Sequence, residues 1–419
     1  VTTEDELLAA FEQGGTITLG ADFTFRNTAV LKADTILDLN GHTLTYEFVR
    51  GESSYSYAIY NDYNGTPYNL TIQDTSQSGD GQLLSNQYLF SGTFNKLTIT
   101  GGAMSGVYTS GINCSGLEIT GGSIDAGRFT VNGNAALSGG TIGESIQINA
   151  NAVAGQADSG KLTVSGSFVS NGAAYLSAAN GVTLAGNAAF NNGLTVRSAV
   201  VIEDGVSVIV PDDGGYTRKI NFYGTGNVTI NGGYFEVGNR HFLYCVGNSG
   251  TAKQFVINGG TFYLKSTSNW TTGLFYYCTP IINGGVFMAD CDRIIFGNSW
   301  NARDLQIKGG YFQKPLGTSY EGDNHVPTFQ YPSGYTISTD TLGNLTGDTG
   351  EYRDYYWVTR STEVTYDVDH EPVDGETSDF TGTAYTTYTG GSMMAAPSTD
   401  TYTAYNPLVP YRTGEFSFK

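Results

Sequence analysis

The chain has few basic residues and no long apolar run. Of its 419 residues, 20 are Lys or Arg and 39 are Asp or Glu, which gives a formal net charge of −19. This charge disfavours nucleic acid and anionic membrane surfaces as partners. No apolar run approaches the ~20 residues that a membrane-spanning helix needs. We therefore expect neither nucleic-acid binding nor membrane insertion.

Cysteine and histidine are also scarce, and their spacing supports no common metal or redox site. The four cysteines are Cys114, Cys245, Cys278 and Cys291. They form no C-x-x-C motif, so we expect buried free thiols, with a disulfide as the alternative. The four histidines are His42, His241, His325 and His370. They are too scattered to support a histidine-based catalytic triad.

Glycine is abundant, with 57 residues against 10 prolines, and it shows no collagen-like period of three. A short apolar stretch, two glycines, a spacer and an apolar residue recur along the chain. The glycine pairs are Gly101-Gly102, Gly121-Gly122, Gly139-Gly140, Gly232-Gly233, Gly259-Gly260, Gly284-Gly285 and Gly309-Gly310. Spacings of 20 and 18 residues among the first three pairs, and of 27, 25 and 25 residues among the last four, are typical of a solenoid.

The repeat predicts one strand and one tight turn in each coil. Side chains alternate along a strand, and glycine adopts positive φ without steric cost. The residue two places after each pair should therefore return to the interior and stack on its equivalents in neighbouring coils. These residues are Met104, Ile124, Ile142, Phe235, Phe262, Phe287 and Phe312.

The first residues predict a helical cap. Thr3 and Glu6 match a capping box, and Leu7, Leu8 and Phe11 form one apolar stripe. Gly14-Gly15 ends the pattern, so we expect a helix at about residues 4–12 that covers the open end of the first coil. Strands should follow at 16–19 and 35–41.

The passage from Glu6 to Thr45, with Leu37-Asp38-Leu39-Asn40-Gly41, resembles the first coils of right-handed parallel β-helix proteins of the pectate-lyase-like superfamily. More narrowly, it resembles β-helix modules of surface proteins of gut bacteria, and the Asn-Gly-Gly-x-Phe coils strengthen that likeness. The resemblance covers about residues 1–325. It implies an all-β fold, a right-handed parallel β-helix, but no particular chemistry, because lyases, hydrolases, adhesins and phage spikes share this architecture.

Two further segments follow the repeat. Residues 326–360, with strand-like stretches at 335–338 and 355–359, are interpreted as a β-rich C-terminal cap. Residues 361–419 are rich in Thr and Tyr and hold a single leucine, Leu408, so this tail cannot build its own core. We expect an extended arm that adds strands to a neighbouring copy of the chain, with a flexible spacer as the alternative.

The coils between residues 216 and 315 are longer than the others and richer in aromatics, and extra residues in a solenoid emerge as loops on one face. Aromatic faces with nearby carboxylates suit sugar binding. The candidate substrate-binding residues are Trp270, Tyr276, Tyr277, Trp300, Asp290, Asp292 and Arg293. The alternative interpretation makes the strand residues inward-facing and the two aspartates ordinary turn carboxylates.

Evidence for catalysis is weak. Asp290 and Asp292, with Arg293 or with Arg240 on an earlier coil, form the one cluster that resembles a lyase centre. The Gly-His-Gly turn and Arg-x-Lys strand of the related hydrolases are missing. We assign no catalytic residue and leave open whether the chain is an enzyme, with non-catalytic as the favoured interpretation. No metal site is assigned, no cofactor is expected, and Ca²⁺ is the one cofactor left open.

Three functions remain. The first is a secreted or surface-exposed structural protein that self-associates through its tail, with a rigid rod as its body, as in a filament. The second is a glycan-binding adhesin or phage-type spike. The third is a polysaccharide lyase or glycoside hydrolase. The chain opens at Val1-Thr2-Thr3 without a signal-peptide pattern, and its composition favours an exported protein from which that signal was removed, located outside the cell or at its surface.

Overall fold

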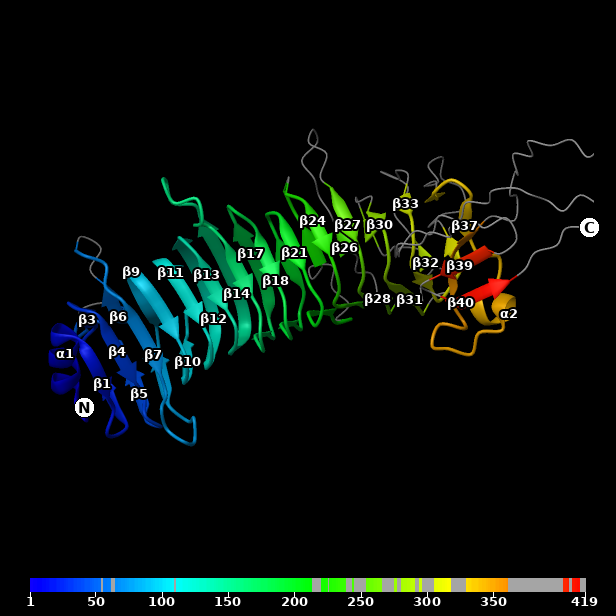
Figure 1. Cartoon of the computed structure of the whole chain (residues 1–419). Coiled ribbons are helices and arrows are strands. Elements are labelled where there is room, and N and C mark those ends of the chain that lie inside the picture. Colours follow the sequence, from blue (N-terminus) through cyan, green and yellow to red (C-terminus); the bar gives the residue numbers. More distant parts are fainter. Residues whose placement is uncertain are drawn as a thin grey trace, which may run out of the picture.

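The computed structural model describes residues 1–53, 56–61, 65–108, 111–212, 220–224, 226–238, 243–244, 254–265, 275–276, 280–290, 294–295, 305–317, 329–360, 402–406 and 409–414. The chain forms an all-β solenoid, in which short and mostly parallel strands stack side by side along one axis (Figure 1). The candidate residues Trp270, Tyr277, Trp300, Asp292 and Arg293 lie outside the described residues.

Each coil contributes strands to parallel ladders, here called ladders A, B and C. Ladder A contains β1 (Gly15–Thr18), β4 (Thr35–Asp38), β7 (Leu70–Gln73), β9 (Tyr88–Ile99), β11 (Gly111–Ile119), β13 (Ala135–Leu137), β15 (Leu162–Val164), β18 (Val182–Leu184), β21 (Val200–Ile202), β24 (Val228–Ile230), β27 (Phe255–Ile257), β30 (Ile281–Ile282), β33 (Leu305–Ile307) and β36 (Phe329–Gln330).

Ladder B follows the turn after ladder A. It contains β2 (Phe23–Phe25), β5 (Thr43–Tyr46), β8 (Gln82–Ser85), β10 (Ala103–Gly106), the start of β12 (Ser123–Asn132), the start of β14 (Thr141–Asn151), β16 (Val169–Ser170), β19 (Ala189–Phe190), β22 (Ser207–Val210), β25 (Tyr234–Val237), β28 (Thr261–Leu264), β31 (Val286–Ala289) and β34 (Tyr311–Phe312).

Ladder C closes the coil. It contains β3 (Ala29–Leu31), β6 (Tyr57–Asn61), parts of β9, β11, β12 and β14, β17 (Ala173–Ala178), β20 (Leu194–Val196), β23 (Ile220–Phe222), β26 (Leu243–Tyr244) and β29 (Phe275–Tyr276). A separate parallel pair joins β32 (Ile294–Ile295) to β35 (Leu316–Gly317). Strand β29 thus includes the backbone of the candidate residue Tyr276.

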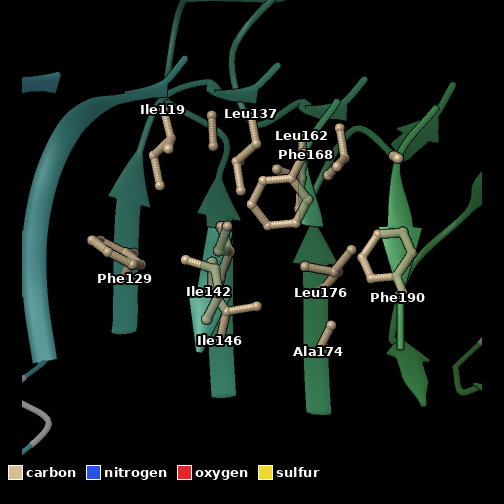
Figure 2. Packing of buried hydrophobic residues seen from close by; sticks show 14 of the residues in the cluster. Ile119, Phe129, Leu137, Ile142, Ile146, Leu162, Phe168, Ala174, Leu176 and Phe190 are labelled. Carbon is tan, nitrogen blue, oxygen red and sulfur yellow. The ribbon is translucent and has the colours of Figure 1, made fainter. Parts of the chain in front are cut away.

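The core is built from columns of equivalent residues. Ladder A stacks one aliphatic residue per coil, from Ile17 and Leu37 at one end to Ile282 and Ile307 at the other, and these residues are buried. In the middle of the rod, side chains from facing strands such as Ile142, Leu162 and Leu176 point into a common interior (Figure 2). Because each coil buries its apolar face against its neighbours, stability is shared along the stack.

The predicted apolar ladder after the glycine pairs is confirmed. Its seven residues lie in one register column of ladder B, in which Leu83 pairs with Met104 and Val208 pairs with Phe235. Phe235, Phe262, Phe287 and Phe312 are fully buried and stack face to face, with ring centroids 4.9, 5.0 and 5.1 Å apart and interplanar angles of 6–9°.

The two glycines of each pair are required for different reasons. The second glycine has positive φ, for example 98° at Gly260 and 111° at Gly285. The first one lies against the preceding coil, since a Cβ at Gly259 would come within 2.5 Å of the Asn231 carbonyl oxygen. A side chain at the first position would collide with that coil, and one at the second would strain the backbone.

The predicted N-terminal helix is confirmed as α1 (Glu4–Gln13), with Leu7 and Phe11 buried against the first coil. The Thr3 hydroxyl accepts from the Glu6 amide at 3.4 Å. The Glu6 carboxylate reaches back to the amide of Thr2, at 2.7 Å, one residue before the N-cap. The helix therefore caps the end of the solenoid, as its sequence indicated.

The far end of the stack is covered by the chain itself. Strand β38 (Tyr356–Arg360) pairs antiparallel with β34 and with β37 (Tyr335–Ile337). The short helix α2 (Leu342–Thr346) lies in the connection between β37 and β38. The strands expected in residues 335–359 are thus present. In the tail, β39 (Tyr402–Asn406) and β40 (Val409–Gly414) form an antiparallel hairpin. The tail strands predicted at 362–368 and 414–418 fall outside the described residues except for Gly414.

Candidate functional site

An open groove of about 510 Å³ runs along the turns between ladders A and B in the later coils. We call it the turn groove. It is lined by Asp204, Gly205, Val206, Ser207, Gly233, Tyr234, Gly260, Thr261, Gly285, Val286, Tyr311 and Tyr352. The lining spans β22 to β34, four coil-to-coil steps, or ~19 Å at the usual strand spacing of ~4.8 Å.

Repetition of one turn type builds this groove. Its floor is backbone at glycines of positive φ, which is 83° at the single glycine Gly205 and 99° and 98° at the second glycines Gly233 and Gly260. One wall is a register row of outward residues, in which Tyr234 pairs with Thr261 and Val286 pairs with Tyr311. Because the floor carries no side chains, a ligand can approach the main chain closely along the rod axis.

The end of the groove nearest the C-terminus is aromatic. The rings of Tyr311 and Tyr352 stack with centroids 4.2 Å apart, and Tyr355 meets Tyr352 edge-on at 5.5 Å. Burial, together with Tyr352 and Asp348, raises the pKa of Tyr311 to about 12. These hydroxyls therefore stay protonated at neutral pH and can both donate and accept hydrogen bonds.

A hydrogen-bonded network lies beside the groove on the outer face of ladder B. The Tyr234 hydroxyl donates to Glu236 at 2.7 Å, and Lys265 donates to the same carboxylate at 2.6 Å. The Tyr263 hydroxyl donates to Asp290 Oδ1 at 2.6 Å, and the Lys265 ammonium lies 5.7 Å from the centre of the Tyr263 ring. The network links three successive coils.

The hydrogen-bonded network beside the groove does not provide an acid–base pair suited to catalysis at neutral pH. Burial opposes ionisation of Glu236, but hydrogen bonds from Lys265 and Tyr234 outweigh it and lower the pKa of this carboxyl. The hydrogen bond to Asp290, with some burial, raises the pKa of Tyr263 to about 12. General acids and bases work best with a pKa near the working pH. Glu236 stays ionised and Tyr263 stays protonated.

The opposite end of the groove is acidic. Asp204 is exposed, and its carboxylate lies over Gly232, where a Cβ would meet the Asp204 carboxylate. Next to it, Glu203 accepts from the Asn231 amide at 3.0 and 3.1 Å. This bond starts a ladder of amides, in which Asn258 donates to Asn231 and Asn283 donates to Asn258, both at 2.8 Å. The amide ladder holds the turns in register.

A second open space, of about 630 Å³, lies between the ladder A strands β9, β11 and β13 and the loop at 152–161. Lys96 pairs with Glu118 there, and Lys161 pairs with Asp158 at 2.8 Å. Its lining has no aromatic residue. It offers no ring for stacking on a sugar, so we take the turn groove as the candidate site.

Of the seven predicted site residues, the structure describes the side chain of Asp290 alone. That carboxylate accepts from Tyr263 and so belongs to the network beside the groove. Within the described ranges, no group of three or more His, Cys, Asp or Glu is placed to hold a metal ion. Cys114 is a buried free thiol, as expected, and burial raises its pKa to about 12.

Tyr234, Tyr263 and Tyr311 are outward-facing site residues that were not predicted from the sequence. The signal was present, because Tyr234 and Tyr311 each occupy the spacer position of a Gly-Gly-Tyr-Phe sequence. Strand alternation places the spacer outside whenever the following Phe is inside. The contribution of Tyr352 could not be found this way, because it comes from the cap rather than from the repeat.

No protein-family model, curated protein or solved structure matches this chain. The helices that the structure describes are all too short or too polar to cross a membrane.

Proposed function

We propose that this chain is a non-catalytic surface rod that binds a linear glycan in the turn groove. The observation that carries the proposal is the groove itself, a glycine-floored channel along the rod axis that ends at the stacked pair Tyr311 and Tyr352. Extended polymers fit elongated grooves, and aromatic rings stack on the apolar faces of sugars. The hydroxyl-bearing residues Ser207, Thr261 and Tyr234 also line the channel.

The non-catalytic part of the proposal rests on the protonation states beside the groove. The lowered pKa of Glu236 and the raised pKa of Tyr263 leave neither group able to exchange a proton easily near neutral pH. We propose that binding needs no cofactor, so a metal chelator should leave it unchanged. Exposure of such a rod to glycans implies a location outside the cell or at its surface.

We also propose that the solenoid is a right-handed parallel β-helix of the pectate-lyase-like type. The support is general, because parallel strands joined by crossover connections are right-handed in the great majority of cases. An experimental structure would test the hand directly, and left-handed coils would remove the likeness.

We propose self-association as a second candidate function, and the two ends of the solenoid limit which part of the chain could join copies. Helix α1 covers one end of the described solenoid, and β38 pairs with β34 at the other. End-to-end stacking of bare coils is therefore blocked at β34, and assembly would use the tail after Arg360. Light scattering on the full chain and on a form that ends at Arg360 tests this idea. An equal mass per particle, corresponding to a monomer, would contradict it.

Glycan binding is tested on an array of linear polysaccharides with the full chain and two variants. Tyr352→Ala removes the outer ring of the aromatic end and should weaken binding about tenfold. Tyr175→Ala is the matched control, since Tyr175 is an exposed tyrosine on ladder C, away from the groove. Thermal unfolding of both variants checks that the cap stays folded.

The proposal fails if the wild-type chain binds no glycan. It also fails if Tyr352→Ala and Tyr175→Ala bind as well as wild type while both remain folded.

A further inference from the structure

Resting on the proposed function, we infer that the turn groove selects neutral glycans and rejects polyuronates. The proposed glycan would carry hydroxyl or acetamido groups but no carboxylate on each sugar. The inference comes from the charges in and around the groove.

The groove lining holds one charged residue, and that residue is acidic. Asp204 lies at one end of the channel, exposed to solvent. For the part of the chain that the structure describes, we find no hydrogen bond or ion pair to its carboxylate. A sugar hydroxyl can donate to such a carboxylate, whereas a uronate would face it with the same charge.

More carboxylates surround the channel. Glu203 lies beside Asp204, Asp290 lies on the outer face of ladder B, and Asp348 acts on Tyr311 at the aromatic end, whereas the charge of Glu236 is balanced by Lys265. Charges within a Debye length of about 8 Å at physiological salt still act on a bound ligand. The groove therefore lies in a negative field, in line with the chain's net charge of −19.

Two basic side chains near the groove already have acidic partners, Lys265 with Glu236 and Arg353 with Asp354, and a third, Lys308, precedes the Gly309-Gly310 turn but does not line the groove. None of the residues that line the groove is basic. Lys265 is bound to Glu236 at 2.6 Å and covers the Tyr263 ring, so its charge is already paired. A polyuronate brings one carboxylate per sugar, and recognition of such a ligand normally uses Arg or Lys in the site. The described lining has no such partner for it.

The neutral lining suits an uncharged polymer instead. The Tyr311 and Tyr234 hydroxyls stay protonated because burial raises the pKa of both groups. Ser207 and Thr261 add hydroxyls, and the glycine floor lets a sugar ring lie against the main chain. Specificity then combines attraction by neutral groups with repulsion of the charged competitor.

The test measures binding of hexasaccharides to the full chain by calorimetry. The neutral probes are β-1,4-linked glucose, mannose and galactose hexamers and the methyl ester of hexagalacturonate. The acidic probe is hexagalacturonate itself, which has the same backbone as its ester. We expect the best neutral probe to bind at least about tenfold more tightly than the acidic one at low salt. This ratio should shrink at about 1 M salt.

Asp204→Asn should tighten binding of the acidic probe about threefold. Asp80→Asn is the matched control, because it removes the same charge from an exposed turn near the other end of the rod. Equal or tighter binding of hexagalacturonate would overturn the inference but leave glycan binding intact. Binding of no probe, neutral or acidic, would overturn both the inference and the proposed function.

Discussion

The middle coils and the late coils use different turns between ladders A and B. In the late coils the inward residue of ladder A and that of ladder B are five residues apart, as in Ile257 and Phe262. In the coils at about residues 162–210, here called the middle coils, the two inward residues are six apart, as in Leu184 and Phe190. The added residue is apolar and buried, and it is Phe168, Ala188 or Val206.

This difference explains where the Gly-Gly repeat stops and where the groove starts. A turn with a buried extra residue needs one glycine at positive φ, such as Gly186 at 63°. A five-residue turn has no inward filler and packs its first glycine against the preceding coil. The turn groove starts at Asp204 and Val206, in the last long turn, and continues over the short ones.

The late coils also repeat single residue types, which the middle coils do not. Their ladder B column is an unbroken stack of phenylalanines, whereas the middle column runs Ser170, Phe190 and Val208. Identical side chains in identical rotamers stack only in one register. We therefore expect register in the late coils to depend more strongly on single residues.

The largest effect should come from Phe262→Ala. This ring packs between those of Phe235 and Phe287, so its loss opens a cavity in the stack. The free energy of unfolding should fall by about 3–5 kcal/mol. Val208→Ala, in the same column of a middle coil, should cost about 2 kcal/mol. Denaturant unfolding measures both, and equal losses would contradict the comparison.

Changes at the glycine pair should be next in size. Gly259→Ala puts a Cβ within 2.5 Å of the Asn231 carbonyl oxygen, so neighbouring coils must separate, at a cost of about 2–3 kcal/mol. Gly155→Ala is the control for backbone strain alone, because Gly155 has positive φ, unlike Gly259, and no atom lies within 4 Å of its Cβ position. It should cost about 1 kcal/mol. The same denaturant titration measures the free energy of unfolding of both variants. A larger decrease for Gly155→Ala than for Gly259→Ala would argue against close contact between coils at Gly259.

The amide ladder gives a smaller effect. Asn258→Ala removes two bonds of 2.8 Å, one to Asn231 and one to Asn283, and should cost about 2 kcal/mol. Asn191→Ala, in a middle coil, removes one bond of 2.9 Å to Asn171 and should cost about 1 kcal/mol. If both variants unfold at the wild-type midpoint, the ladders do not hold the turns.

The smallest effect is pH dependence, and in the first coils Asp38 should contribute to it. Burial opposes ionisation of Asp38, but hydrogen bonds from Thr75 and Asn40 outweigh it and lower its pKa from the usual 3.8. A lowered folded-state pKa stabilises the fold above the unfolded value, and this stabilisation is lost as pH falls through the folded value. Stability should therefore decline below about pH 4.

Asp38→Asn should reduce that decline in the first coils, where Asp74 also has a lowered pKa, and Asp80→Asn should not. Hydrogen exchange of the first coils near pH 3 and pH 7 measures the difference. The pKa of Glu236 in the late coils is also lowered, so their protection should fall at pH 3 as well, but equally in the wild type and in Asp38→Asn. If Asp38→Asn lost as much protection in the first coils as the wild type does, Asp38 would not be its source.

Much of the fold could be predicted from sequence, because the two-glycine turn, the alternating strand and the capping box are local signals. The Phe262 stack and helix α1 followed from them. The long middle turns were not predicted, since a single glycine followed by a buried Ala188 or Val206 carries no distinct local pattern. The groove was missed for another reason. Its walls come from residues about 25 apart and from Tyr352 in the cap, which only the coil register brings together.

Hydrogen exchange with and without the tightest-binding neutral hexasaccharide tests the central claim most directly, namely that the late turns form a glycan-binding groove. The account predicts slowed exchange in the turns at 204–207, 231–235, 258–262 and 283–287 and around Tyr352, with no change in the middle coils. Slowed exchange confined to other parts of the chain would contradict it.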